Sequence, residues 1–377
     1  MRLLHLADLH LGYKQFPRLT PSGRNQREQD VSDTFAATVQ RCIDLKPDLI
    51  VVAGDVFHQT RPSNWALMDA AEGFKRLHRE LPDAEVVAIA GNHDENRVNA
   101  EGPILRLLKY AGVNVVYGKE PQLLTLRTGL QVACVPERAV GVKTWRDWAA
   151  PSRVLVLHGE IRGAIPNSPE EHAIDMDHSE WGYVALGHYH VRSDLWPNGG
   201  YSGSLDYVSS DIWGEAREGV PKGFVEFDTV TQRRTFHATA PRRVVDLPAI
   251  DALGWPRTKI EAACLAALEF SGSDGAVVRQ VVTNLTRTEW RGLNWRQLPR
   301  HAKAGCLMYQ ADPRFAEKQK SPLSPEGFKQ RMQSLDVMVA EYLSKRILPE
   351  GLDRTAFVEL GSRYLMQAKD STPSEPT

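Results

Sequence analysis

Hydrophobic and polar positions change their period along the first 120 residues of the chain. Short apolar runs that end in polar residues are typical of buried strands, and they occur at residues 2–8, 47–55, 84–94 and 113–118. Apolar residues at helical spacing fill the segments between these runs, at residues 27–45, 63–80 and 103–112. This alternation of strands and helices predicts a sheet that is covered by helices.

Later segments are richer in strands. Residues 122–137 predict a hairpin that turns at Thr128-Gly129. Further strands are expected at residues 152–161, 182–190, 199–205 and 222–239. A four-layer α/β/β/α sandwich accommodates both halves of this pattern.

The pattern breaks between Pro241 and Pro256. We therefore expect a main domain at 1–245, a small α+β cap domain at 246–320, a helical segment at 321–370 and a disordered tail at 371–377. In the helical segment, residues 326–345 carry an apolar stripe at steps of three and four residues, followed by a short helix near 355–368. Such a stripe docks on a partner helix in some proteins, and more often it packs into the protein's own core.

Composition excludes several classes of protein. The net charge of −1 rules out a globally basic nucleic-acid binder, although a local basic surface is still allowed. No apolar run is long enough to cross a membrane, and the first residues do not resemble a secretory signal. The four cysteines form no CxxC pair, so we expect packed thiols in a reducing cytoplasm.

Polar residues with metal-binding side chains follow the expected strands. They are Asp8, His10, Asp55, Asn92, His158, His188 and His190. Because the carboxyl ends of strands in an open α/β sheet form its ligand-binding edge, we expect these side chains to gather there. A mixture of carboxylate, amide and imidazole without thiolate suits two ions of manganese, iron or zinc. Two such ions clamp a phosphate and generate a hydroxide nucleophile at neutral pH.

Each of these residues also has a simpler explanation. Asp55 follows Gly54 and Asn92 follows Gly91, so each could serve only a turn. The full set in five segments favours a metal site, whereas any single member could still be structural.

The order D-x-H, G-D, G-N-H-D, H and G-H-x-H resembles that of the calcineurin-like metallophosphoesterases over roughly residues 1–240. The resemblance implies one ion at Asp8, His10, Asp55 and His190, and a second ion at Asp55, Asn92, His158 and His188. Asp55 would bridge the two ions. The resemblance also implies that His93 stands over the phosphate, and that Asp94 orients His93 by accepting a hydrogen bond from the other N–H of its ring.

Three features are similar to the SbcD-type DNA-repair nucleases within this family: the "GDVFH" segment that adds His58, the initial "DLHLG", and "YSGSLDY" followed by "KGFVEFD". This resemblance implies that His58 faces the scissile phosphate. It further implies a manganese-dependent DNA exo/endonuclease for double-strand-break repair or recombination. Its partners would be DNA, an SbcC-like ATPase of the structural-maintenance type and a second copy of the chain.

Two basic segments are candidates for DNA contact. Residues 13–29 include Arg24 and Arg27, and residues 279–303 interleave arginines with Trp290 and Trp295. The arginines singled out in the second segment are Arg287, Arg291 and Arg296. Arginine beside tryptophan suits phosphate contact and base stacking, but a helix with buried tryptophan and solvated arginine fits equally well.

Two other functions fit the same motifs. One is hydrolysis of a small-molecule phosphodiester or a phosphoprotein, for which His58 and the carboxyl-terminal third of the chain would have little use. The other is a scaffold with little catalysis, against which the complete ligand set argues.

Overall fold

The first sheet sets the edge at which the candidate site lies. The computed structural model describes residues 1–95, 102–166, 168, 173–270, 274–293, 305–315, 342–344, 346, 348 and 353–370. The sheet has the order β12-β11-β1-β2-β3-β4. Its strands are β1 (Arg2–Leu6), β2 (Leu49–Val52), β3 (Glu85–Ile89), β4 (Val113–Val116), β11 (Gly223–Asp228) and β12 (Arg233–Ala238). Strands β1 to β4 are parallel, so their carboxyl ends share one edge, whereas β11 and β12 pair in antiparallel fashion.

The second sheet has the order β5-β6-β7-β8-β10-β9. Its strands are β5 (Gln122–Thr125), β6 (Gln131–Val135), β7 (Val154–His158), β8 (Tyr183–Gly187), β9 (Ser193–Trp196) and β10 (Gly199–Tyr201). The predicted hairpin is confirmed as the antiparallel pair β5–β6, and β6, β7 and β8 are parallel. The expected strand at 199–205 ends early, because Gly203 turns the chain with a φ of 76°.

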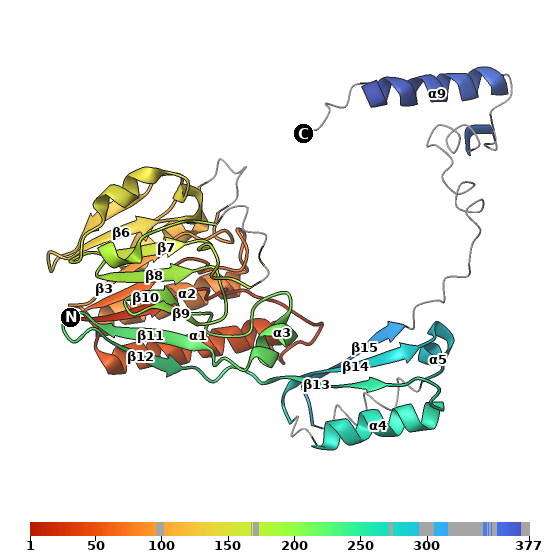
Figure 1. Ribbon diagram of the computed structural model, residues 1–377, viewed down its shortest axis with the longest axis horizontal. Coiled ribbons are helices and arrows are strands. Elements are labelled where there is room, and N and C mark those ends of the chain that lie inside the picture. The colour runs from red at the N-terminus through yellow and green to blue at the C-terminus, as the bar shows by residue number, and fades with distance from the viewer. Residues whose placement is uncertain are drawn as a thin grey trace. The chain divides into compact units, whose positions relative to one another are not determined.

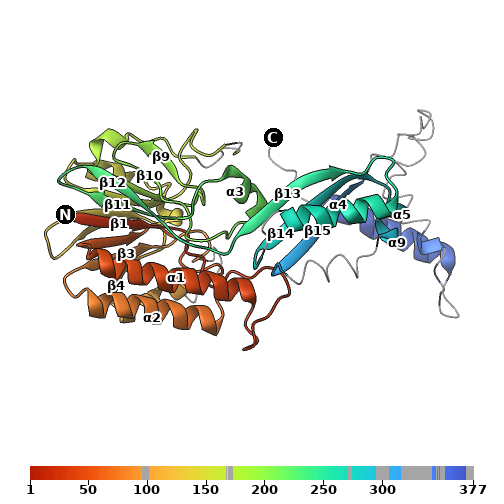
Figure 2. The same cartoon turned by 90° about the horizontal axis from the view of Figure 1, so that it is seen from below.

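The two sheets pack face to face around one apolar layer. Leu3 and Val51 of the first sheet share this layer with Val156 and Ala185 of the second, and all four are fully buried. The other face of the first sheet is covered by α1 (Gln26–Leu45), α2 (Asn64–Glu80) and η1 (Ile104–Ala111). Figure 2 shows α1 and α2 side by side along this face.

Short 3-10 helices supply the fourth layer, on the outer face of the second sheet. They are η2 (Glu137–Ala139), η3 (Lys143–Trp148) and, farther along the chain, η4 (His178–Glu180). Trp145 of η3 is 1% exposed and packs in the cluster that includes Leu155 and Leu157 of β7. The expected α/β/β/α sandwich is thereby confirmed (Figure 1), although the helix expected at 103–112 is the 3-10 helix η1.

Side-chain caps explain where the two long helices begin. Asn25 accepts hydrogen bonds from the backbone N–H groups of Arg27 and Glu28, and Ser63 accepts one from Ala66. Each cap satisfies backbone donors that have no partner inside the helix. The predicted starts at residues 27 and 63 therefore fall within one residue of the observed ones.

The chain divides into two compact units, Met1–Arg314 and Phe315–Thr377. The first unit also contains a three-stranded sheet of β13 (Val244–Asp251), β14 (Val277–Leu285) and β15 (Met308–Phe315), with helices α3 (Ile212–Glu218), α4 (Arg257–Phe270) and α5 (Arg287–Gly292). Leu247 and Val278 of this sheet pack with Leu268 of α4. The second unit contains α9 (Arg354–Asp370).

Several expectations about the carboxyl-terminal part remain predictions. The apolar stripe at 326–345 lies outside the described residues, except for 342–344, and so does the tail at 371–377. The short helix near 355–368 is present as α9.

Two expectations from composition can be compared with the structure. All four cysteines are buried and free of disulfides, as predicted. Among the helices of the described residues, none has the length and apolarity needed to span a bilayer.

Candidate metal centre

Strands from both sheets deliver the predicted ligands to one edge. Asp8 and His10 follow β1, Asp55 follows β2 and Asn92 follows β3, while His158 ends β7 and the residues His188 and His190 follow β8. The loops after β1 and β2 are joined by backbone hydrogen bonds from Asp8 N to Gly54 O (3.1 Å) and from His10 N to Asp55 O (2.9 Å). The structure therefore brings all seven residues together.

One group of donors forms around Asp8 and His10. The Nε2 atoms of His10 and His190 are 3.0 Å apart, and His10 Nε2 is 3.6 Å from Asp55 Oδ2. Candidate ligand atoms of Asp8, His10 and His190 all lie within 4.8 Å of one another. These are the residues expected at the first ion.

A second group forms around Asn92. Its Oδ1 atom lies 3.0 Å from His158 Nε2 and 3.2 Å from His188 Nδ1. Asp55 Oδ2 is 3.5 Å from the same His158 nitrogen. The Asp55 carboxylate therefore borders both groups, which is the position of a bridging ligand.

Burial favours the neutral form of two of the imidazole donors, His10 and His188. Asp8, His10 and His158 are fully buried, and Asp55 is 1% exposed. Burial and the neighbouring imidazoles lower the pKa of His10, and burial followed by His158 lowers the pKa of His188 to about 4. A neutral imidazole keeps a lone pair for a metal.

Against the effect of burial, neighbouring carboxylates raise the pKa of His158 and His190, so these two imidazoles would lose a proton when a cation binds. The grouping of carboxylate, amide and imidazole donors fits two divalent ions. Nitrogen and oxygen donors without sulfur are typical of manganese, iron or zinc sites.

The backbone at four ligands adopts a conformation that favours glycine. The φ angles of Asp8, His10, Asp55 and His188 are 52°, 46°, 51° and 106°. A positive φ at a non-glycine residue is strained, and such strain concentrates at functional sites. Gly91 is required for a different reason: a Cβ atom there would lie only 2.1 Å from Asp55 Oδ1 and would clash with it.

His58 and His93 lie beside the first donor group. Their rings stack with centroids 5.3 Å apart, and His58 Nδ1 is 3.2 Å from His10 Nδ1. Burial and His93 lower the pKa of His58 to about 4. His93 is held by two contacts: its backbone N–H donates to Asp55 Oδ1 (2.9 Å), and its Nδ1 donates to the carbonyl oxygen of His58 (2.8 Å).

Asp94 does not have the role that the resemblance implied. Its carboxylate is fully buried and accepts hydrogen bonds from the backbone N–H groups of Val56, Phe57 and Gly91. The acceptor for the His93 ring is the carbonyl of His58 instead. Asp94 thus ties the loop after β2 to the loop after β3.

A cleft opens beside the second donor group. Its volume is ≈ 770 Å³, and Asn92, His158 and His188 line it together with Lys119 and Arg138. Two carboxylates, Glu137 and Glu160, line the same cleft, so its side chains carry charges of both signs next to the donors.

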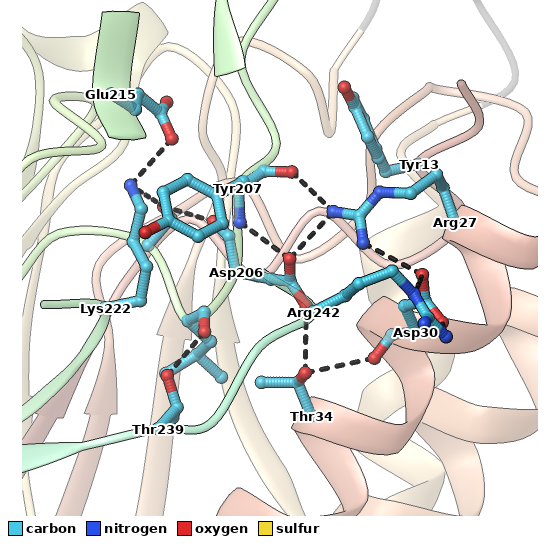
Figure 3. Close-up of polar contacts among 12 residues, drawn as sticks. Tyr13, Arg27, Asp30, Thr34, Asp206, Tyr207, Glu215, Lys222, Thr239 and Arg242 are labelled. Carbon is cyan, nitrogen blue, oxygen red and sulfur yellow. Dashed lines mark hydrogen bonds and ion pairs between the residues drawn. The ribbon is translucent and has the colours of Figure 1, made fainter. Parts of the chain in front are cut away.

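Arg24 and Arg27 are interior cations, against the expectation that they contact DNA. Arg27 is 1% exposed and donates to Asp30 Oδ2 (2.9 Å) and Asp206 Oδ1 (2.8 Å), as Figure 3 shows. Arg24 is 4% exposed and pairs with Glu28 and Asp69. The basic pattern of this loop therefore reflects buried ion pairs.

The second basic segment is only partly described. Arg287 and Arg291 are exposed on α5, which begins with a capping box formed by Thr286 and Glu289. Arg296 and Trp295 lie outside the described residues. DNA contact by this segment stays a prediction.

Two polar residues at the site were missed by sequence reasoning. Glu215 of α3 contacts His190, and Lys222, just before β11, contacts Glu215. The "KGFVEFD" segment drew attention to the strand, but no spacing rule links either residue to a ligand.

Comparisons with known proteins agree with this geometry. The model of the calcineurin-like phosphoesterase family matches residues 1–192. The chain is 30% identical to a DNA double-strand break repair protein Mre11 of Methanocaldococcus jannaschii over 240 residues, which cover 60% of this chain and 62% of the relative. It is 29% identical to the protein of that name from Haloferax volcanii over 255 residues, covering 65% and 54%.

The chain thus spans less than two thirds of the length of these curated relatives. The family model matches residues 1–192, which are more than half of the 377 residues and contain the site from Asp8 to His190. This protein belongs to the calcineurin-like phosphoesterase family.

Proposed function

We propose that the protein is a metal-dependent DNA nuclease that hydrolyses phosphodiester bonds. The observation that carries the proposal is the position of Asp55 between two donor groups, with His93 beside them. The names of the relatives support DNA double-strand breaks as the setting, in repair or recombination. The partners that we propose are DNA, an SbcC-like ATPase and a second copy of the chain.

The residues act on the scissile phosphate in distinct ways. Two divalent ions, for which we propose Mn²⁺, supply charge neutralisation and a water of lowered pKa when they are bound. Asp8, His10, Asp55 and His190 would hold one ion, and Asp55, Asn92, His158 and His188 would hold the other.

His93 serves as the proton donor. The His58 carbonyl accepts a hydrogen bond from Nδ1, so the doubly protonated ring of His93 would give its Nε2 proton to the departing sugar oxygen and return to the neutral Nδ1–H form. His58 would face the same phosphate, a role supported by the stacking of its ring on that of His93.

The experiment that tests the function compares substrates. Manganese-loaded protein is assayed on single-stranded DNA, double-stranded DNA and a small chromogenic phosphodiester, beside the Asp55→Asn variant as an inactive control. We expect cleavage of DNA that disappears in the variant. Cleavage of the small ester alone would favour a small-molecule phosphodiesterase, and no hydrolysis of any substrate would favour a scaffold.

DNA binding is tested separately by its salt dependence. Phosphate contacts release counterions, so the affinity should fall steeply as salt rises. Arg291→Ala should reduce the slope of log affinity against log salt by about 1 if this arginine contacts a phosphate. A flat salt response would count against a DNA substrate, and an unchanged slope in the variant would remove Arg291 from the interface.

A further inference from the structure

A buried ion pair stands behind one of the ligand histidines. Lys222 Nζ lies 2.7 Å from Glu215 Oε2, and the other carboxylate oxygen of Glu215 lies 3.3 Å from His190 Nδ1. Lys222 is 4% exposed and Glu215 is 8% exposed. A charged pair in this position is costly to bury, so its presence calls for a specific role.

The lysine is fixed by more than its charge. Its ammonium group also donates to the backbone oxygen of His190 (2.9 Å) and to Ser204 Oγ (3.1 Å). The Ser204 backbone N–H donates to the same His190 oxygen at 3.0 Å. Lys222 therefore holds the main chain of His190 while it holds the carboxylate that faces the ring. Figure 3 shows Lys222 extended toward Glu215.

The His190 ring spans the space between this pair and the donor cluster. Its Nε2 atom faces His10 Nε2 at 3.0 Å, and its Nδ1 atom faces Glu215. A carboxylate that accepts a hydrogen bond from Nδ1–H leaves the Nε2 lone pair for a metal and fixes the plane of the ring. By contrast, His158 Nδ1 meets only the backbone oxygen of Ala53.

We propose that Glu215 and Lys222 are a positioning pair that fixes the tautomer and direction of His190, and so sets the affinity of the ion expected at Asp8, His10 and His190. Lys222 balances the carboxylate charge, so the pair orients the ligand without adding net charge beside it. This inference rests on the metal centre of the proposed function. The pair does not touch Asn92 or His158, so its effect should be confined to one ion of the two.

The test measures Mn²⁺ binding to the full chain by calorimetry and by the electron paramagnetic resonance of the coupled ion pair. In Glu215→Ala we expect one ion to bind about 10–100-fold more weakly, as is typical when a carboxylate behind a ligand histidine is lost, and the coupled signal to give way to that of a single ion. The other ion should keep its affinity. Glu218→Gln, an exposed position on the same helix, is the matched control and should bind both ions like the wild type.

A pair of double variants isolates the acceptor and avoids an unpaired buried lysine. E215Q/K222M and E215M/K222M lack both charges and have side chains of similar size, but only the first can accept a hydrogen bond from His190 Nδ1–H. We expect E215Q/K222M to bind the affected ion at least about tenfold more tightly than E215M/K222M. Equal affinities in the two double variants, or equal weakening of both ions in Glu215→Ala, would overturn the inference. If the wild type bound no Mn²⁺ ions, the proposed metal centre itself would be refuted. If the wild type bound two Mn²⁺ ions and Glu215→Ala bound both with unchanged affinity, only the inference about Glu215 and Lys222 would be refuted.

Discussion

His93 Nδ1 lies 2.8 Å from the backbone oxygen of His58, so the group that orients one candidate catalytic histidine is the main chain of the other. A backbone oxygen survives any change of the His58 side chain. The hydrogen bond that orients His93 therefore does not need the His58 imidazole, although the two rings stack, and this allows the two side chains to be tested separately.

Replacement of His93 by alanine should separate cleavage from binding. The imidazole is not a member of either donor group around Asp55, so Mn²⁺ and DNA affinities should stay near those of the wild type. The rate of cleavage should fall by about 10²–10⁴-fold, which is typical for the loss of a general acid. Single-turnover cleavage measures the rate, and titrations with DNA and with Mn²⁺ measure the two affinities. A normal cleavage rate would refute the role of His93.

His58→Ala is the partner measurement. His93 keeps its hydrogen bond to the backbone oxygen of residue 58 in this variant. The cleavage rate of His58→Ala should therefore fall less than that of His93→Ala. A loss as large as that of His93→Ala would mean that the His58 ring itself takes part in proton transfer.

Asp94 should matter chiefly to stability. Asp94→Ala leaves three buried backbone N–H groups without an acceptor, at about 1–3 kcal/mol for each unsatisfied group. We expect the free energy of unfolding in urea to fall by at least about 3 kcal/mol. His93→Ala serves as the control, since its side chain is only half-buried and should cost far less. An unchanged free energy of unfolding in Asp94→Ala would contradict this structural role and favour the expected role of Asp94 in orienting the His93 ring.

Arg27 should likewise act through folding. Arg27→Met leaves Asp206 and Asp30 with less charge compensation in a buried position, and breaking such a pair typically costs about 3–5 kcal/mol. Arg18→Met, at an exposed position of the loop that precedes α1, should change the free energy of unfolding very little. Equal stability of the two variants would show that the Arg27 cluster is not what holds this loop.

The pH dependence of stability should carry a signature of His5. Burial lowers the pKa of His5 to about 3, with the Leu186 carbonyl opposing the shift and Arg234 adding to it. His5 binds a proton near pH 6.5 in the unfolded chain but stays neutral in the folded chain until the pH is near 3. The contribution of neutral His5 to the free energy of unfolding is therefore complete above pH 6.5 and is lost as the pH falls from 6.5 toward 3. His5→Gln removes the titration.

Urea unfolding of both proteins between pH 7 and pH 4, in the presence of a chelator, measures the effect. The wild type should lose about 1.4 kcal/mol per pH unit more than the variant below pH 6. Parallel pH profiles would mean that His5 titrates alike in both states.

The gathering of the ligand residues at one edge could be predicted from the sequence, because each of them follows an apolar run. A run such as "LIVVAGD" marks both the strand and the place where it stops, and parallel strands stop at a common edge. Helix starts were predictable for the same local reason, since Asn25 and Ser63 cap helices with their own side chains.

Other features depend on contacts that no local pattern contains. Arg27 has the appearance of a solvated loop cation, but its partner Asp206 is 179 residues away. Glu215 reaches His190 through the placement of α3, which is set by tertiary packing. Asp94 follows His93 directly, yet its carboxylate turns to three backbone groups instead of the adjacent ring.

The positive φ angles at Asp8, His10, Asp55 and His188 mean that heat resistance and chemistry select opposite residues at these positions. Glycine would relieve about 1–3 kcal/mol of backbone strain at each one and would remove a donor each time. At His188, the half-buried member of the four, directed evolution for thermal survival alone should therefore drift toward glycine, and a screen that also demands turnover should keep the histidine.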